Sequence, residues 1–401
     1  MNVLFITTQF PYPLDNGGKI GAYNGISVLS RDYDVTVLSF TEEPQYVEEG
    51  VSFFREKFNS VKFENPVIHD VHIRNNPMKL VEALAIGYCL RQPYIVSKFY
   101  DSKMLQLIDE KFSNNAYWDI IFIDYLNMQS YGQYIREKYK TQFGKYILKD
   151  HNIEYDLVLQ EAESSRGLKK KLLQLEYKRT RKYEEAAVNR ADYCFSVCDA
   201  NTEVLKKIND NSYTMLPTYE MLTGVKKNIE KNTILYLGNL SWKSNMQGLV
   251  WFLESIYPNI QQRIPDVKIT IVGSGPVGTD FSKYSGVDYR GYVKDISHIY
   301  DDQTVLIVPL LEGSGIRIKI LEAFNNEIAV VSTLVGCDTI GAKDGSELFI
   351  ADNEKDFATA VVRLLEDMNL NEKVRKNAKL FLKEKYSLTA RQDEFSAIIN
   401  S

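Results

Sequence analysis

The stretch from Val305 to Phe324 constrains the fold of this chain more than any other. It opens with four consecutive apolar residues, Val305–Val308, which is typical of a strand buried on both faces of a parallel sheet. Pro309 then lacks the amide proton that a further ladder bond would need. A glycine-containing loop, 312–315, follows, and apolar residues recur at helical spacing from Ile316 onward. The stretch therefore predicts a strand, a tight turn and a helix, which is the repeating unit of a parallel α/β sheet.

The turn in this stretch also has the chemistry of an anion site. The first amides of a helix have no intrahelical partner, and the helix dipole adds positive potential at the same place. Arg317 and Lys319 fall in the predicted first turn, where the dipole disfavours cations. This placement favours an anionic ligand, with a plain turn and two solvated cations as the alternative.

The bulk properties limit the class of protein. At 401 residues, the chain exceeds the size at which one core stops growing, so we expect two domains. A net charge of −5 argues against non-specific binding of nucleic acid. The four cysteines form no CxxC pair, which favours buried thiols in a reducing compartment. The N-terminus resembles a first strand rather than a signal peptide, and no apolar run approaches the roughly 20 residues of a bilayer span. We expect a cytoplasmic protein, at most peripheral to the plasma membrane.

Two features of the N-terminal half are candidates for a ligand site. Gly17 and Gly18 precede a predicted helix and allow close approach of the backbone to a ligand. The dinucleotide fingerprint is absent, which disfavours a dehydrogenase. His151 directly follows a predicted strand, at the end where open α/β sheets bind ligands. We expect strands in this half at 3–6, 35–40, 61–63, 120–124, 146–150 and 191–198.

The remainder of this half is less informative. Asp32–Asp34 has the DxD spacing of some metal sites, but it precedes a strand, so we interpret it as a turn. We expect helices at 78–90 and 102–112, and one long, highly charged helix at 161–189. A solvated face with Glu–Lys pairs is the favoured interpretation of that helix. A basic patch at 166–182 that faces anionic lipid or an anionic acceptor is the alternative.

The C-terminal half repeats the alternation of strands and helices. The polar stretch 223–232 is typical of a linker between domains. We expect strands at 234–237, 268–272, 287–290, 305–308, 329–333 and 346–350, and late helices at 356–366, 372–385 and 391–399. The two halves predict two doubly wound parallel sheets, with the loops at their strand ends lining one cleft between domains 1–218 and 219–385.

Four motifs of the C-terminal half together suggest a family. They are Tyr236–Trp242, Ile271–Pro276, Arg290–Asp295 and Glu312–Ala323. On these motifs, and over nearly its whole length, the chain resembles the retaining glycosyltransferases of family 4 (glycosyl transferases group 1). Within that family it is similar to the sugar transferases of bacterial surface-polysaccharide and glycoprotein assembly. The resemblance implies a GT-B fold, in which residues 386–401 pack back on the N-terminal domain.

The resemblance also implies where a nucleotide-sugar donor binds. Glu322 matches a glutamate that grips the ribose hydroxyls, and His151 matches a histidine near the transferred sugar. Arg317 and Lys319 would neutralise the leaving diphosphate together with the amides after the glycines of the loop. The remaining residues that the resemblance assigns to the donor are Gly17, Gly18, Gly273, Tyr292, Val293, Gly313, Ser314, Gly315 and Ile316.

The chain departs from the family pattern at two positions. In the pattern, a first glutamate stands where this chain has Ser314, and the nearest glutamate here is Glu312, two positions earlier. Glu312 would take that role if the loop is longer in this subgroup. The pattern often has an arginine where this chain has Asn239, and Lys243 or Arg317 is the candidate to replace its charge.

The resemblance implies transfer of a hexose-type sugar to a glycan, lipid-linked or protein-linked acceptor, with retention at the anomeric carbon. A UDP-sugar is favoured over a GDP-sugar as donor, and no metal or other cofactor is expected. Two alternatives stay open: a nucleotide-sugar epimerase of the same fold, and a non-catalytic partner subunit of a transferase.

Overall fold

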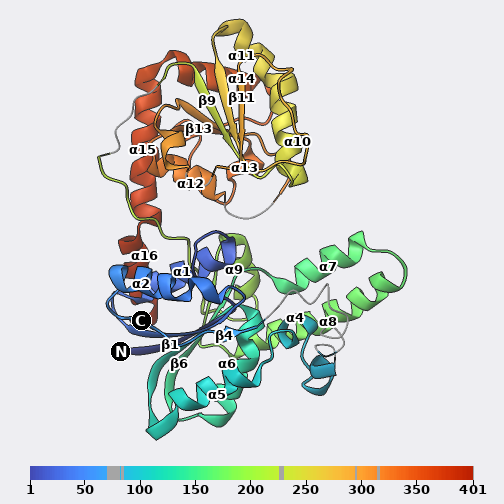
Figure 1. The fold of residues 1–401 in the computed structure, drawn as a ribbon, viewed down its shortest axis with the longest axis vertical. Helices are drawn as coiled ribbons and strands as arrows, with labels where there is room; N and C mark the ends of the chain where they lie inside the picture. The colour runs from blue at the N-terminus through green and yellow to red at the C-terminus, as the bar shows by residue number, and fades with distance from the viewer. Residues whose placement is uncertain (70–81, 83–84, 225–229, 294–295, 314–316, 401) are drawn as a thin grey trace. The chain divides into compact units, whose positions relative to one another are not determined.

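The computed structural model divides the chain into two compact units (Figure 1). It describes residues 1–69, 82, 85–224, 230–293, 296–313 and 317–400. The N-terminal domain comprises Met1–Thr218 and Arg391–Ser401, and the C-terminal domain comprises Tyr219–Ala390. Each domain has its own parallel sheet and its own hydrophobic core. In the part of the chain that the structure describes, no helix is both long enough and apolar enough to cross a membrane.

The sheet of the N-terminal domain is parallel throughout, as the sequence predicts. Its order is β3-β2-β1-β5-β6-β7-β8, with β4 paired to β2. The order changes direction between β1 and β5, and such a switch point is where open α/β sheets bind ligands. The strands are β1 Asn2–Thr7, β2 Asp34–Thr41, β3 Val61–Phe63, β4 Val67–Ile68, β5 Trp118–Asp124, β6 Phe143–Asp150, β7 Tyr193–Ser196 and β8 Ser212–Thr214.

Helices cover this sheet because its strands are apolar on both faces. Phe5 of β1 and Phe122 of β5, for example, stack with their ring centroids 4.8 Å apart. The last helix packs here through Phe395, whose ring centroid lies 5.4 Å from that of Phe195, and through Gln392, which donates to the carbonyl oxygen of Ser27. The helices are α1 Gly17–Leu29, α2 Val47–Lys57, α4 Tyr94–Ser97, α5 Ser102–Lys111, α6 Gln129–Lys138, α7 Glu154–Ser164, α8 Gly167–Arg190, α9 Asp199–Lys206 and α16 Leu388–Asn400.

The helices of this domain agree only in part with the sequence predictions. The single helix predicted at 161–189 is wrong: α7 ends at Ser164, and Gly167, with a φ of +62°, starts α8. Of the helix predicted at 78–90, residues 82 and 85–89 are helical, while 78–81, 83 and 84 lie outside the described residues. At the Asp32–Asp34 triplet the predicted turn is confirmed, since residues 31 and 32 form a turn shortly before β2. Asp32 forms an ion pair of 3.0 Å with Arg31 there.

The C-terminal domain has a six-stranded parallel sheet in the order β11-β10-β9-β12-β13-β14. This is the doubly wound order, with its switch point between β9 and β12. The strands are β9 Thr233–Leu237, β10 Lys268–Val272, β11 Val287–Gly291, β12 Val305–Val308, β13 Ala329–Ser332 and β14 Phe349–Ile350. Part of the linker predicted at 223–232 lies outside the described residues.

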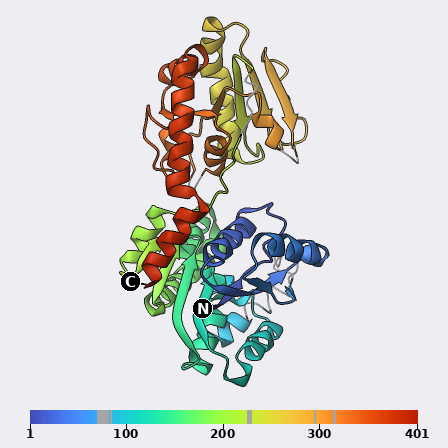
Figure 2. The ribbon, with the colours of Figure 1, turned by 90° about the vertical axis from the view of Figure 1, so that its left-hand side faces the viewer.

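Helices lie on both faces of this sheet, with the long α15 along one side (Figure 2). They are α10 Lys243–Trp251, α11 Tyr257–Arg263, α12 Ile318–Asn325, α13 Leu334–Cys337, α14 Glu354–Glu366 and α15 Met368–Tyr386. A π-helical turn, Phe252–Ile256, joins α10 to α11. The predicted start of α12 was too early, because Arg317 is its N-cap rather than a residue of its first turn. The strand predicted at 346–350 is only Phe349–Ile350.

Candidate functional site

His151 belongs to a buried polar network at the carboxyl edge of the N-terminal sheet. Its Nε2 lies 2.8 Å from Oδ1 of Asp124, the last residue of β5. The other carboxylate oxygen of Asp124 accepts a hydrogen bond of 2.8 Å from Oγ1 of Thr7, at the end of β1. Nζ of Lys149, on β6, donates to Asp124 at 3.1 Å and to the carbonyl oxygen of Gly21 at 2.7 Å. The network therefore joins three strands and α1 at the switch point of the sheet.

Burial and the charge of Lys149 keep His151 neutral. Burial, and then the nearby charge of Lys149, lower the pKa of His151 to about 4, against the attraction of Asp124. Burial alone would raise the pKa of Asp124, but Lys149 and His151 lower it to about 2. At neutral pH, an imidazole that donates from Nε2 to a carboxylate keeps Nδ1 as a hydrogen-bond acceptor. The ring of Tyr125 stacks on the imidazole, with centroids 3.6 Å apart, and fixes its plane.

The glycine loop that the sequence singles out begins α1. Asn16 caps this helix by accepting a hydrogen bond of 3.0 Å from the amide of Lys19. Gly17 lies in open space, whereas a Cβ on Gly18 would meet Nε2 of Gln9. A Cβ on Gly21, one turn further along the helix, would lie 2.4 Å from Cε1 of His151. Any side chain at position 21 would therefore overlap the imidazole of His151. This contact was not predicted from the sequence.

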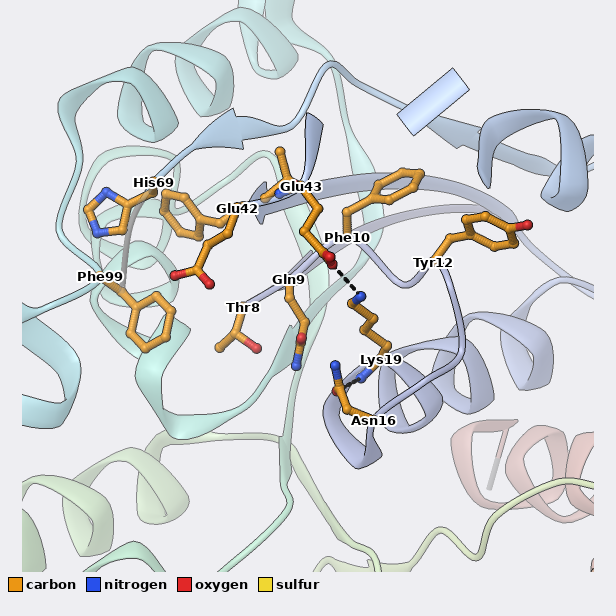
Figure 3. Close-up of a pocket in the computed structure, with 12 residues that line it drawn as sticks. Thr8, Gln9, Phe10, Tyr12, Asn16, Lys19, Glu42, Glu43, His69 and Phe99 are labelled. Atoms are coloured by element: carbon orange, nitrogen blue, oxygen red, sulfur yellow. Dashed lines mark hydrogen bonds and ion pairs between the residues drawn. The ribbon is translucent and has the colours of Figure 1, made fainter. Parts of the chain in front are cut away.

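A cavity of about 330 Å³ lies in the same domain, beside the carboxyl ends of β1 and β2 and the start of α1 (Figure 3). Nζ of Lys19 crosses it to donate to Oε2 of Glu43 at 2.6 Å. His69, on its wall, has Nε2 2.8 Å from the carbonyl oxygen of Lys98. The cavity thus combines aromatic faces with carboxylates and amides. The lining residues are Thr8, Gln9, Phe10, Tyr12, Asn16, Lys19, Phe40, Thr41, Glu42, Glu43, His69 and Phe99.

In the C-terminal domain, the candidate residues gather at the carboxyl ends of four neighbouring strands. Asn239 follows β9, Gly273 follows β10, Tyr292 follows β11, and Glu312 follows β12. Gly273 has a φ of +146°, and a Cβ there would lie 1.8 Å from the carbonyl oxygen of Gly238. Only glycine allows these two loops to approach so closely.

Glu322 and Lys319 lie on α12, which follows β12. Oε2 of Glu322 accepts a hydrogen bond of 3.0 Å from the hydroxyl of Tyr300. Burial raises the pKa of Glu322, against that hydrogen bond and the charge of Lys319. Nζ of Lys319 donates to the carbonyl oxygen of Leu237 at the end of β9 and lies 5.4 Å from the ring centroid of Tyr236. Lys319 therefore bridges the two strands that flank the switch point.

The cations of this region are partly desolvated. Burial, and then the charge of Arg317, lower the pKa of Lys319 to about 8, so that Lys319 is still mostly protonated at neutral pH. Burial also lowers the pKa of Arg317. Gly313 has a φ of +129°, and a Cβ there would lie 2.8 Å from Nη2 of Arg317. Two desolvated cations beside a glycine turn form an environment that favours an anion.

Several of the predicted site residues at these strand ends make no contact with Glu322 or Lys319 among the described residues, or lie outside those residues. Asn239 and Lys243 are exposed, with Oδ1 of Asn239 accepting from the amide of Ser241. Tyr292 is 74% exposed, Val293 is half-buried, and Glu312 is exposed. Ser314, Gly315 and Ile316 lie outside the described residues.

Two kinds of residue that contact His151 or Glu322 were not predicted from the sequence. Asp124, Thr7 and Lys149 hold His151, and each stands at or near the end of a buried strand, which is a usable signal. Tyr300 carries no such signal, because it reaches Glu322 from a 3₁₀ turn, Ser297–Tyr300, that precedes β12.

Comparison with known proteins adds a family match for one domain. Residues 231–367 match the family described as Glycosyl transferases group 1. An uncharacterized 44.6 kDa protein in the cps region of Klebsiella pneumoniae is 24% identical over 417 residues, which cover 96% of each chain.

Solved structures share the whole fold at low identity. Sucrose-phosphate synthase from Thermosynechococcus elongatus has a TM-score of 0.65 and 14% identity, covering 100% of this chain and 98% of that chain. Alr3699/HepE from Anabaena, in complex with UDP and glucose, has a TM-score of 0.64 and 13% identity, covering 100% of both chains. The chain therefore has the GT-B fold of two doubly wound parallel-sheet domains, and the family match supports glycosyl transfer.

Proposed function

We propose that this protein is a retaining glycosyltransferase that moves a hexose from a UDP-sugar to a glycan, lipid-linked or protein-linked acceptor without a metal. The observation that carries the proposal is the β12–α12 unit, which places Arg317, Lys319 and Glu322 together inside the segment that matches the family. The UDP in the Anabaena structure favours uridine as the base. The relative in the cps region supports a role in polysaccharide assembly.

Glu322 would bind the ribose of the donor. A carboxylate can accept about four hydrogen bonds, so the bond from Tyr300 leaves capacity for two ribose hydroxyls. Tyr300 holds the carboxylate in one orientation, which reduces the entropy lost when the nucleotide binds. Asn239, Lys243, Gly273, Tyr292 and Val293 would complete the donor site, with Tyr292 and Val293 against the base.

Arg317 and Lys319 would stabilise the departing diphosphate. Breaking the bond between sugar and phosphate builds negative charge on the leaving oxygens, and fixed cations and amides lower the free energy of that transition state. An arriving diphosphate would raise the pKa of Lys319 and keep it protonated. The amides of residues 313–316 would add donors to this cradle, and Glu312 would contact the donor sugar. With two cations in place, the chemistry requires no metal ion.

The N-terminal domain would supply the groups that hold the sugars. Neutral His151 offers Nδ1 as an acceptor for a sugar hydroxyl, since its Nε2 is bonded to Asp124. Gly17 and Gly18, at the start of α1, would add backbone donors for the donor phosphate. The cavity of Figure 3 is the candidate acceptor subsite, because aromatic faces and carboxylates suit the two faces and the hydroxyls of a sugar ring.

The test is a panel of UDP- and GDP-sugars, with UDP release measured in the presence of candidate glycan acceptors. We expect release of UDP, unaffected by EDTA, and a product whose anomeric configuration by NMR matches that of the donor. Donor that changes sugar identity without acceptor would show an epimerase instead. Absence of nucleotide binding by calorimetry would point to a non-catalytic partner subunit.

A further inference from the structure

Helices α7 and α8 form a hairpin that projects from the N-terminal domain (Figure 1). It begins three residues after His151, so its base adjoins the polar network. The carboxylate of Glu184 on α8 accepts hydrogen bonds of 3.0 Å from the amides of Glu154 and Tyr155, at the start of α7. Arg181 lies 5.7 Å from the ring centroid of Tyr155. The base of the hairpin is therefore firmly held.

The outer half of α8 presents leucines to solvent. Leu168, Leu172 and Leu175 are 74%, 57% and 61% exposed. Their spacing of four and three residues places them on one face of the helix. The buried residues of α8 begin only at Thr180. Single exposed leucines are ordinary, but three on one helical face form an unpartnered apolar stripe.

Cations surround this stripe. Residues 164–175 contain Arg166, Lys169, Lys170 and Lys171 and no acidic residue. Lys171 is exposed on the same face as the leucines. Lys169 forms an ion pair of 3.0 Å with Glu161 of α7. A solvated helix would carry polar residues at the leucine positions. In a contact between two copies of this face, Lys171 of one copy would meet the cations of the other, and like charges that meet disfavour self-association.

We propose that this face of α8, Leu168–Leu175, docks on a membrane surface that contains anionic lipid. A basic helix with an apolar stripe buries its leucines at the boundary of headgroups and acyl chains while its cations contact the headgroups. The hairpin leads directly from the loop of His151, so docking would bring the N-terminal domain to a membrane-borne acceptor. Lipid binding itself requires no catalytic activity, so the proposal can fail independently of the proposed function.

The experiment is co-sedimentation of the full chain with vesicles of phosphatidylcholine, with and without phosphatidylglycerol. We expect sedimentation with the anionic vesicles, weakened at high salt. Leu168→Glu with Leu172→Glu should reduce the bound fraction at least tenfold. Leu380→Glu is the matched control, since Leu380 is an equally exposed leucine (55%) on α15, and it should sediment like the wild type.

Thermal unfolding measures whether the variants are folded, and light scattering measures whether the protein is a monomer or a dimer. The milder double variant Leu168→Gln with Leu172→Gln should unfold like the wild type and still lose vesicle binding. Wild-type protein that does not sediment with anionic vesicles, or leucine variants that sediment as well as the wild type, would overturn the proposal. So would a wild-type dimer that these substitutions convert to a monomer without vesicle binding, because the stripe would then be a contact between two copies.

Discussion

At the scale of single residues, the N-terminal domain depends on the contact between Gly21 and His151. The ring of Tyr125 stacks on the imidazole, the backbone of α1 at Gly21 packs closely against its Cε1, and Asp124 holds Nε2. A ring confined in this way has one orientation, so Nδ1 has one direction in which to accept a hydrogen bond. A change at Gly21 therefore alters the site without touching its polar groups.

Gly21→Ala should destabilise the N-terminal domain by about 1–3 kcal/mol, because the added methyl overlaps the buried ring. Thermal or denaturant unfolding measures this loss. Gly17→Ala is the control for stability, since the same change on the same helix meets open space. Equal unfolding free energies for the two variants would contradict the close contact of α1 with His151.

Arg317→Ala should reduce kcat by on the order of 100-fold at saturating donor, as loss of a group that stabilises transition-state charge does. The fold should persist, because Arg317 caps α12 without a side-chain cap bond. Steady-state kinetics and a melting curve together measure both effects. Arg263→Ala, which removes an exposed arginine paired with Glu366, is the matched control. Wild-type kcat in Arg317→Ala would show that this cation does not act on the diphosphate.

The positions of His151 and Glu322 were predictable because both stand in a strong local pattern, a strand end and a strand–turn–helix unit. The residues that contact these two side chains were harder to predict from the sequence. Gly21 lies inside a helix, where sequence alone gives no reason for a glycine, and Tyr300 meets Glu322 across a turn. Side-chain contacts between distant segments depend on the packing of the helices, which periodicity does not specify.

At the scale of elements, the strands followed from the sequence far better than the helix boundaries. Parallel strands buried on both faces have nearly continuous apolar runs, so Val3–Ile6 and Val305–Val308 were unmistakable. The break between α7 and α8 was missed because charge continues across it, and only the positive φ of Gly167 marks it. Charge also favoured a solvated surface for α8, whereas the exposed leucines now favour a lipid surface.

The junction between β6 and α8 contains a pair of buried carboxyl groups that should make stability depend on pH. Burial, and then neighbouring carboxylates, raise the pKa of Asp150, and burial raises the pKa of Glu184 to about 8. The folded state thus holds a proton that the unfolded state releases near pH 4–5, so stability falls as pH rises toward 8. His151 acts in the opposite direction, but only below pH 6.5, where the unfolded histidine takes up a proton.

The window from pH 6.5 to 8 therefore isolates the carboxyl pair. There, the unfolding free energy of the N-terminal domain should fall by about 1 kcal/mol per pH unit. Glu184→Gln should flatten this slope, because it removes the carboxyl group whose pKa is about 8 and also the neighbouring charge that raises the pKa of Asp150. Denaturant unfolding at several pH values is the measurement. An unchanged slope in Glu184→Gln would assign the pH dependence to other groups.

At the scale of the whole molecule, the division into two cores has a thermodynamic consequence. The candidate nucleotide groups, Arg317, Lys319 and Glu322, belong to the C-terminal domain alone. A ligand stabilises the structure that binds it by RT ln(1 + [L]/Kd), about 2.7 kcal/mol at 100 times Kd. UDP should therefore raise the unfolding temperature of the C-terminal domain directly, and that of the N-terminal domain only through coupling.

Tryptophan fluorescence can separate the two domains in the full chain. Trp242 and Trp251 belong to the C-terminal domain, and Trp118 to the N-terminal domain. In Trp118→Phe, fluorescence reports the C-terminal domain, and UDP should raise its melting temperature by several degrees. In Trp242→Phe with Trp251→Phe, the signal of Trp118 should shift less. A larger UDP effect on Trp118 would place the nucleotide in the N-terminal domain and reverse the assignment of donor and acceptor domains.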